Sequence, residues 1–390
     1  MSDAKLLMSL NRLLAQQRLQ SQGETKTTDK APRDLFARIS TKEICLITRQ
    51  LVTLLRAGMP LAQALFALSE QLGDSIGQAS NRKHAYLAAV LQDIYTQVNA
   101  GQAFSEALSH YPRLFSPLYI HMVETGQATG NLETTLQQLA DSFEKRIQLT
   151  VQIRSALTYP VMMCVVSVGV VLFLVTYVVP NMSQIFQELN RALPWPTMVL
   201  IAASQFMHRY LGVLVVVMGV FGALLYRLLR QGPIRQAVDR FLLRVPLVGG
   251  LLLKIEIARL TRTMATLLAG GVPILRSLDI TRAIIQNRMI QQAWARIEES
   301  VRRGVSLAES VKQTGCFPPV VFHILSTGQT SGNLDAGLFD IADMYDQDIQ
   351  ASTKTLASLI EPFVLLAMGV VVGFIVLAML LPIFEINQTL

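Results

Sequence analysis

The sequence lacks the motifs by which many enzymes bind phosphate or a metal. It contains no GxxxxGK[ST] loop and no GxGxxG after a strand. His121 and Glu124 stand three residues apart in a helical pattern, but the matching positions of a later segment are His323 and Ser326, and no further ligand cluster accompanies either pair. We therefore predict that the protein is not an enzyme, and we assign no catalytic, cofactor-binding or metal-binding residue.

Charged residues and cysteines are also scarce. Asp, Glu, Lys and Arg make up 16% of the 390 residues, hydrophobic residues make up 51%, and the mean hydropathy is +0.40. This composition departs from that of soluble domains, in which about 25% of residues are charged. The three cysteines, Cys45, Cys164 and Cys316, suggest no disulfide framework, so we expect reduced thiols. No signal peptide precedes residue 39, so we expect the chain to begin in the cytoplasm.

Long apolar runs account for the hydropathy. Three of them contain no Asp, Glu, Lys, Arg or His, namely residues 161–179, 211–226 and 363–381. Because a bilayer is crossed by about 20 apolar residues, we predict three transmembrane helices. With their flanks they cover residues 159–180, 211–230 and 362–383. Spans without ionisable groups argue against a small-solute permease, which stays the alternative from another class of protein.

Basic residues are distributed unevenly around these runs. Only Arg191 and Arg209 lie in the loop 181–210, whereas several basic residues precede the first span and follow the second. The positive-inside rule therefore places the N-terminus in the cytoplasm and both the loop and the short tail 384–390 outside. We interpret the net charge of +7 as a sign of topology and of contact with membrane lipid, not of nucleic-acid binding.

A repeated phrase reveals an internal duplication. VETGQATGNLE at 123–133 returns as LSTGQTSGNLD at 325–335, and the prolines Pro160 and Pro362 follow at the same offset of 202. Apolar residues recur every three or four positions and strand signals are nearly absent. We therefore predict an all-α membrane protein with two homologous cytoplasmic helical-bundle domains, at 39–158 and 231–361. Residues 1–19 are predicted to form an amphipathic helix and residues 20–38 a flexible linker.

The repeated residues are expected to shape turns between helices. In the phrase, the first glycine of each copy could end a helix in a left-handed conformation, the second could permit the turn, and the asparagine could cap the next helix. The residues concerned are Gly126, Gln127, Gly130, Asn131 and Leu132, and Gly328, Gln329, Gly332, Asn333 and Leu334. A second pair of turns is predicted at Gly58–Pro60 and Gly271–Pro273. Each turn is either purely structural or a docking point for a partner.

Two prolines and a group of acidic residues carry further predictions. Pro160 and Pro362 are expected to stand at the first turn of a membrane helix, where the missing N–H would have no partner in any case. Asp340, Asp343, Asp346 and Asp348 form an acidic face after the second phrase, and we interpret it as solvated or as facing a partner.

The paired GMP/GVP and GQATGNL/GQTSGNL motifs, together with LTYP before the first span and LPWPT in the loop, resemble those of the type II secretion system F family. The resemblance runs from about residue 39 to the C-terminus. That family usually has Glu where this chain has Gln127 and Gln329, so a role that rests on a carboxylate there does not transfer.

The resemblance implies a multi-pass platform protein of the cell inner membrane with a periplasmic C-terminus. It would link the cytoplasmic assembly ATPase to pseudopilins during protein export, with bitopic inner-membrane proteins, membrane lipid and further copies of itself as the other partners. Type IV pilus assembly, with pilins in place of pseudopilins, is the alternative within the family.

Overall fold

The structure is a computed structural model that describes residues 39–74, 82–181, 194–228 and 248–387. In these ranges every regular element is a helix, which confirms the prediction of an all-α protein. The helices are α2 (Thr41–Arg56), α3 (Leu61–Asp74), α4 (Arg82–Asn99), α5 (Phe104–Ser109), α6 (Pro117–Ala128), α7 (Leu132–Phe173), the π-helix η2 (Leu174–Val178), α9 (Trp195–Leu228), α11 (Val248–Ala269), α12 (Ile274–Ile284), α13 (Arg288–Arg302), α14 (Leu307–Thr314), α15 (Pro319–Ser331) and α16 (Leu334–Asn387). The predicted N-terminal helix and linker, residues 182–193 of the loop 181–210 and the end of the tail lie outside the described residues.

Helices α3 and α4 belong to a compact unit of their own, which covers Met59–Gln102 among the described residues. The two helices pack as a hairpin through buried leucines such as Leu65 and Leu91. The rings of Phe66 and Tyr95 lie 5.2 Å apart between centroids, which adds an aromatic contact to the hairpin.

A second unit contains all the other helices. Its first helix set comprises α2, α5, α6 and α7. Ser40 and Glu43 form a capping box that fixes the start of α2, because the Ser40 hydroxyl accepts from an N–H of the first turn while Glu43 accepts from the Ser40 N–H. Helix α2 then packs on α7. Between these helices and α6, the buried Tyr119 shares a hydrogen bond of 3.2 Å with Thr48, and burial raises the pKa of Tyr119 to about 12.

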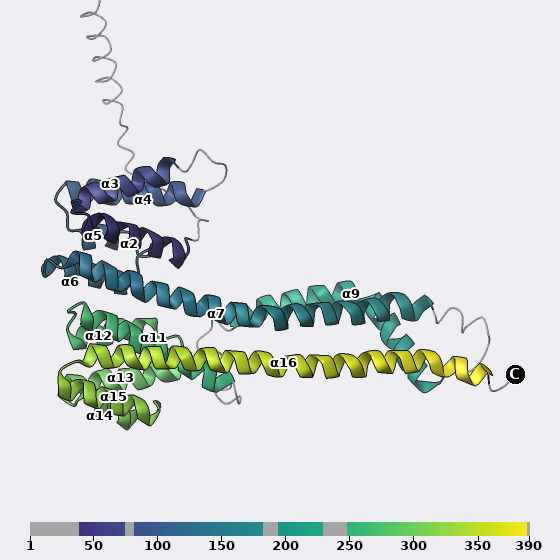
Figure 1. Ribbon diagram of the computed structural model, residues 1–390. Helices are drawn as coiled ribbons and strands as arrows, with labels where there is room; N and C mark the ends of the chain where they lie inside the picture. Colours follow the sequence, from purple (N-terminus) through teal and green to yellow (C-terminus); the bar gives the residue numbers. More distant parts are fainter. Residues whose placement is uncertain (1–38, 75–81, 182–193, 229–247, 388–390) are drawn as a thin grey trace, which may run out of the picture. The chain divides into compact units, whose positions relative to one another are not determined.

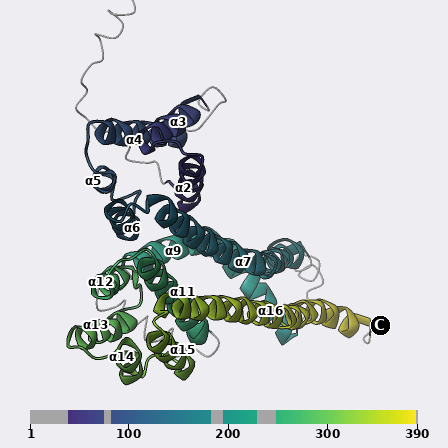
Figure 2. The same cartoon turned by 60° about the vertical axis from the view of Figure 1, so that its left-hand side comes forward.

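The second helix set comprises α11 to α16, and α11 lies along α16 (Figures 1 and 2). Its core is built from the apolar faces of all six helices around residues such as Met264 and Ile341, both fully buried. Trp294 on α13 is also buried, and its indole N–H donates to the Leu278 carbonyl over 3.0 Å. This bond satisfies the one polar atom of the side chain and ties α13 to α12.

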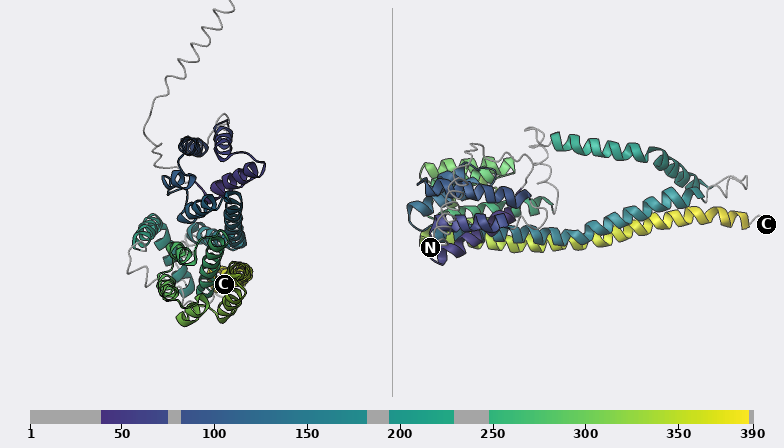
Figure 3. Two further views of the ribbon diagram at one scale, coloured as in Figure 1. Left: turned by 90° about the vertical axis from the view of Figure 1, so that its left-hand side faces the viewer. Right: turned by 90° about the horizontal axis from the view of Figure 1, so that it is seen from above.

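Helices α7 and α16 are the longest elements and run side by side (Figures 1 and 3). Leu132–Asn181 and Leu334–Leu381 are long and apolar enough to cross a membrane, and only 6% and 11% of their most apolar windows are buried within the protein. Large apolar side chains such as Val165, Phe363 and Leu366 are 61% or more exposed. A surface of this kind is stable in lipid but not in water.

The prediction that prolines start the membrane helices is wrong. Pro160 lies 28 residues inside α7, and Pro362 lies at a comparable depth in α16. Each helix therefore runs from the helix set through the proline and into its apolar part without a break. A proline in a helix interior removes one hydrogen bond and can bend the helix, but the long flanking turns keep the helix formed.

The far ends of the long helices meet the beginning of α9. Val175, Val179, Leu200, Ile375 and Ala378 form a small buried cluster there. Figure 3 shows the ribbons of α7, α9 and α16 approaching one another at that end. The buried Thr197 donates a hydrogen bond to the Ala378 carbonyl, which joins α9 to α16. The π-helix η2 lies in the same cluster, and such segments widen a helix by one residue per turn and often accompany functional sites.

Candidate functional site

The second glycine of each repeated phrase makes the turn, and the first does not. Helix α6 ends at Ala128 and α15 ends at Ser331, and the glycines with a positive φ angle are Gly130, at +72°, and Gly332, at +74°. The expectation that Gly126 and Gly328 end the helices in a left-handed conformation is therefore wrong. Both of these glycines lie inside their helices.

Gly126 and Gly328 instead allow two helices to approach closely. A Cβ atom on Gly126 would lie 2.8 Å from the Thr135 hydroxyl oxygen of α7. A Cβ atom on Gly328 would lie 3.2 Å from the Asn333 carbonyl oxygen. Both separations are shorter than ordinary van der Waals contact, so the space for a side chain is missing at each position. The first glycine of the phrase thus sets the distance between a short helix and the long helix that follows it.

The asparagines act through their backbones. Asn131 occupies the position before α7, but its side chain makes no capping hydrogen bond, so the predicted side-chain cap is wrong there. The Asn131 carbonyl accepts from the Thr135 N–H over 3.1 Å, and the Asn333 carbonyl accepts from the Gly337 N–H over 3.2 Å. Leu132 and Leu334 are the first residues of α7 and α16.

The two glutamines have a structural role that the sequence did not reveal. Oε1 of Gln127 accepts a hydrogen bond of 2.9 Å from the Ser105 backbone N–H, and Oε1 of Gln329 accepts one of 2.8 Å from the Ala308 N–H. Each donor is in the first turn of the preceding short helix, α5 or α14, where backbone N–H groups have no partner within the helix. The glutamine therefore caps a helix about 21 residues earlier in the chain. A carboxylate oxygen could accept the same bond.

The other predicted pair of turns has matching geometry in both copies. Gly58 and Gly271 both have a φ of +83°, a value that L side chains rarely adopt. Pro60 and Pro273 follow immediately before α3 and α12, and their carbonyls accept from Ala64 and Ser277 as the first helical hydrogen bonds. These glycine–proline turns thus end one helix and start the next within three residues.

An arginine clamp that sequence reasoning missed occurs once in each helix set. Arg49 of α2 contacts Asp141 and Glu144 of α7. Arg262 of α11 contacts Asp343 and Asp346 of α16 over 2.8 and 2.7 Å. In each clamp the two acids stand three residues apart on one helix face. The sequence contains these residues at corresponding positions of the two copies of the repeat. The two arginines are 213 residues apart, and each acid is 202 residues from its counterpart.

The second clamp corrects the interpretation of the acidic face on α16. Asp343 and Asp346 face Arg262 within the helix set rather than solvent alone or a partner. Burial raises the pKa of Asp343, but Arg262 and Lys145 lower it more, so that the net shift is downward. For Asp346, burial outweighs Arg262 and the pKa is raised. One guanidinium thus pairs with two carboxyl groups whose pKa values are shifted in opposite directions.

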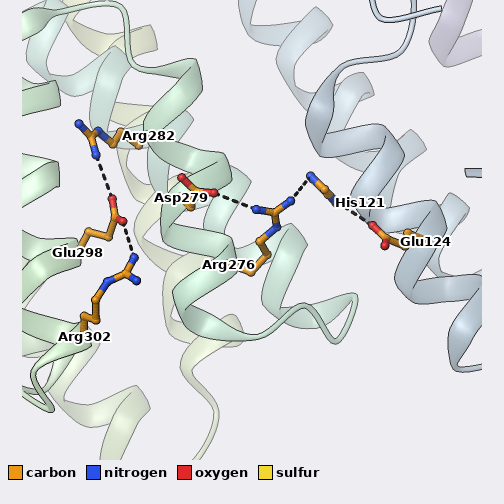
Figure 4. Close-up of polar contacts among 7 residues, drawn as sticks. All are labelled: His121, Glu124, Arg276, Asp279, Arg282, Glu298 and Arg302. Atoms are coloured by element: carbon orange, nitrogen blue, oxygen red, sulfur yellow. Dashed lines mark hydrogen bonds and ion pairs between the residues drawn. The ribbon is translucent and has the colours of Figure 1, made fainter. Parts of the chain in front are cut away.

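Polar contacts join the first helix set to the second (Figure 4). Arg276 of α12 donates to Nε2 of His121 on α6 over 3.0 Å and also pairs with Asp279. Because Nε2 accepts, the His121 proton lies on Nδ1, where it reaches Glu124 over 3.0 Å. His121 is thereby a link between α6 and α12. Figure 4 also shows Glu298 between Arg282 and Arg302, which ties α12 to α13.

The end of α11 also contacts the first set. Gln138 of α7 donates to the Ala269 carbonyl over 3.4 Å. A Cβ atom on Gly270 would lie 2.6 Å from the Met122 sulfur on α6, so this glycine leaves room for the methionine. The glycine–proline turn of the second set is therefore packed directly against α6 and α7.

Metal and thiol chemistry find little support in the part of the chain that the structure describes. No group of three or more His, Cys, Asp or Glu residues is placed to hold a metal ion there. The Cys45 thiol donates to the Ala140 carbonyl, and burial together with Glu144 raises its pKa. A thiol of this kind is a poor nucleophile at neutral pH.

The arrangement defines a class of all-helical membrane-associated proteins in which packed helix sets continue directly into apolar helices. The chain matches the family described as type II secretion system (T2SS), protein F, over residues 47–180 and 260–382. It belongs to this family.

Similar proteins carry two kinds of name. The chain is 38% identical over 355 residues to a type II secretion system protein F of Pseudomonas aeruginosa, a match that covers 90% of this chain and 85% of the relative. It is also 38% identical over 352 residues to the type IV pilus assembly protein PilC of Thermus thermophilus, covering 90% and 84%. A type II secretion system protein F of Aeromonas hydrophila is 33% identical over 384 residues, covering 95% and 96%.

Proposed function

We propose that this protein is the inner-membrane platform of a type II secretion system, a non-enzymatic scaffold that links a cytoplasmic assembly ATPase to pseudopilin assembly and protein export. Membership of the protein F family carries this proposal. The structure adds a physical basis, because packed helices such as α2 and α11 lie on α7 and α16, which continue into apolar segments. A force applied to the packed helices therefore reaches the membrane through continuous helix.

The proposed domain organisation is a tandem repeat. We assign the first cytoplasmic domain to residues 39–158 and the second to 231–361. The glutamine caps, the arginine clamps and the paired glycine turns support the assignment, since each occurs once in each helix set. Such correspondence is expected of one structural unit used twice in a chain.

The proposed topology has three spans, at 159–180, 211–230 and 362–383. Helix α9 supports the second span through exposed apolar residues such as Val216, Val220 and Phe221. With the N-terminus in the cytoplasm, the segment 181–210 and the tail 384–390 are periplasmic. Alkaline phosphatase fused after residue 190 or residue 390 should be active, and fused after residue 300 it should be inactive. Activity of the fusion at 300 would overturn this topology.

The partners proposed are the assembly ATPase, bitopic inner-membrane proteins of the platform, pseudopilins, membrane lipid and further copies of this chain. A pilus assembly platform is the second candidate, because a protein named for type IV pilus assembly is as similar as one named for secretion. Deleting the gene in the host cell distinguishes the secretion function from the pilus function. Deletion of the gene should abolish either export of secreted proteins or surface piliation.

Complementation of that deletion tests the role of the turns. The wild-type gene should restore the lost process, while Gly130→Val and Gly332→Val should restore it poorly, because valine at a positive φ angle strains the backbone. Gly73→Val, in an α-helix with open space around it, serves as the matched control. Intact export and piliation after deletion would refute the platform function. Full activity of both glycine variants would refute a requirement for the turns.

A further inference from the structure

Helices α7 and α11 border a cavity of about 180 Å³ that the platform function does not use. The apolar part of its lining includes Leu118, Phe143 and Leu149. Four basic residues also line it, of which Lys145 and Arg146 come from α7 and Arg259 and Arg262 come from α11. We refer to it as the basic cavity. One carboxylate, that of Asp346, also lines it.

Ion pairs neutralise three of the four cations. Arg259 pairs with Glu256 over 3.4 Å. Arg262 pairs with both acids of its clamp, and Lys145 lies 3.6 Å from Asp343. These pairs also hold the guanidinium groups of Arg259 and Arg262 in place, and their side chains are only 20% and 10% exposed. The guanidinium groups of Arg259 and Arg262 are therefore held in place before any ligand binds.

Arg146 is the exception among these four. Its guanidinium forms no ion pair with an acidic residue in the described part of the chain, although the residue lines the cavity and is exposed overall. Desolvation and the nearby positive charge of Arg259 both lower the pKa of Arg146. Two guanidinium groups that line the same cavity and repel one another create a place where an anion is favoured.

Guanidinium groups match phosphate especially well. Their planar fork donates two parallel hydrogen bonds to neighbouring oxygens, and the bonds are strengthened by charge on both sides. The apolar part of the lining adds contact for the uncharged part of a larger ligand. A phosphate ester can contact both the basic and the apolar residues of the cavity, whereas a halide ion can contact only the basic residues.

The position of the cavity argues against a bilayer lipid as the source of the phosphate. Arg146 stands 14 residues before Pro160, which corresponds to about 21 Å along the helix. The headgroup layer on each side of a bilayer is only about 5–8 Å deep. A headgroup of the surrounding bilayer would therefore stop short of the guanidinium.

We propose that the basic cavity binds the phosphate group of a water-soluble ligand between Arg146 and Arg259. The ligand would bridge α7 of the first helix set and α11 of the second. Its binding would thus couple the two sets at a point distinct from the contact between His121 and Arg276.

The test uses the full chain purified in detergent. Isothermal titration measures the binding of inorganic phosphate and of ADP, as a small phosphate ester, at constant ionic strength. Wild-type protein should bind at least one of them saturably, and Arg146→Gln should weaken the affinity about tenfold or more, because a charge-assisted bond is lost. Arg146→Lys should fall between the two, since the charge stays but the fork is lost.

Arg154→Gln is the matched control, because Arg154 lies on the same helix, is exposed and does not line the cavity. Far-UV circular dichroism verifies that the variants keep their helix content. A further arm compares thermal unfolding in phosphatidylglycerol and phosphatidylcholine nanodiscs without added phosphate. No saturable binding by the wild type, equal binding by Arg146→Gln, or an Arg146-dependent stabilisation seen only with phosphatidylglycerol would each overturn the proposal.

Discussion

Tyr159 and Glu361 stand 202 positions apart in the chain and are joined directly. The Tyr159 hydroxyl donates a hydrogen bond to Glu361 Oε1 over 3.2 Å. Both residues immediately precede a proline, Pro160 or Pro362, at the beginning of the apolar part of a long helix. The helices α7 and α16 therefore touch through the same position of the repeat at the proposed membrane surface.

This relationship predicts a coupled pair of mutations. Tyr159→Phe and Glu361→Ala should each lower the free energy of unfolding in detergent only slightly, because the bond is exposed. The double variant should lose less than the sum of the two, since both single changes break the same contact. Chemical unfolding of the four proteins measures the coupling. Strict additivity would show that the bond contributes nothing in solution.

The glutamine caps predict which substitutions the phrase accepts. Gln329→Glu should keep or slightly raise stability, because a carboxylate can accept the Ala308 N–H and is favoured at a helix N-terminus. Gln329→Leu should cost about 1–2 kcal/mol, since it leaves that N–H without its acceptor. Unfolding curves at pH 7 compare the two variants. Gln313, exposed on α14, provides a neutral control through Gln313→Leu. A loss in the Glu variant as large as in the Leu variant would exclude the capping role.

The close approach at Gly126 predicts a steric defect that a second mutation relieves. Gly126→Ala should lower the midpoint of thermal unfolding, because the new Cβ atom would lie 2.8 Å from the Thr135 hydroxyl oxygen. Thr135→Ala removes that oxygen, so the double variant should recover part of the loss. Gly169→Ala, in an α-helical position with open space, should have little effect. If Thr135→Ala fails to improve Gly126→Ala, the contact is not the cause of the defect.

The two arginine clamps predict unequal losses. Arg262→Gln should cost about 2–3 kcal/mol, because the side chain of Asp346 is 14% exposed and would keep a charge without its partner. Arg49→Gln should cost less than about 1 kcal/mol, since Asp141 and Glu144 are each about half exposed. Urea unfolding of both variants at pH 7 measures the difference. Equal losses would mean that burial does not distinguish the clamps.

The same pair of acids gives the clamp a pH dependence. The pKa of Asp346 is raised in the folded protein, so this group favours folding at pH values below its unfolded pKa and loses that contribution as the pH rises. The pKa of Asp343 is lowered, so its contribution is present above the unfolded pKa and is lost as the pH falls. The deficit of Arg262→Gln at pH 7 should therefore shrink as the pH is lowered and Asp346 takes up a proton, because a neutral Asp346 no longer lacks a charged partner. A deficit that stays constant as the pH is lowered would exclude Asp346 as its source.

Periodicity and repetition predicted much of the fold. Apolar spacing identified helices throughout the described ranges, and the paired phrases marked corresponding turns in the two sets. The role of each glycine could not be predicted in the same way. A glycine that adopts a positive φ, such as Gly130, and one that admits a neighbouring helix, such as Gly126, look alike in a sequence. Only packing separates them.

The remaining differences have a similar cause, because they depend on residues distant in the chain. Pro160 was expected to start a helix because proline favours the first turn, yet the preceding turns of α7 continue through it. Asp343 is predicted to face solvent or a partner, but Arg262, 81 residues earlier in the chain, lies beside it and pairs with it. The glutamine caps join residues 22 and 21 positions apart, a separation at which no local pattern predicts a hydrogen bond.

Because α16 is one unbroken helix, the direction of every side chain on it is fixed relative to all the others. The helix contains 54 residues, which amounts to about 80 Å of one rod. Inserting a single residue near Asp343 would turn every later side chain by about 100° relative to those before it. An insertion or deletion between the clamp and the exposed apolar residues would therefore change the direction in which those residues point relative to the clamp. The acids of the clamp and the exposed apolar surface therefore keep a fixed angular relation to one another along one continuous helix.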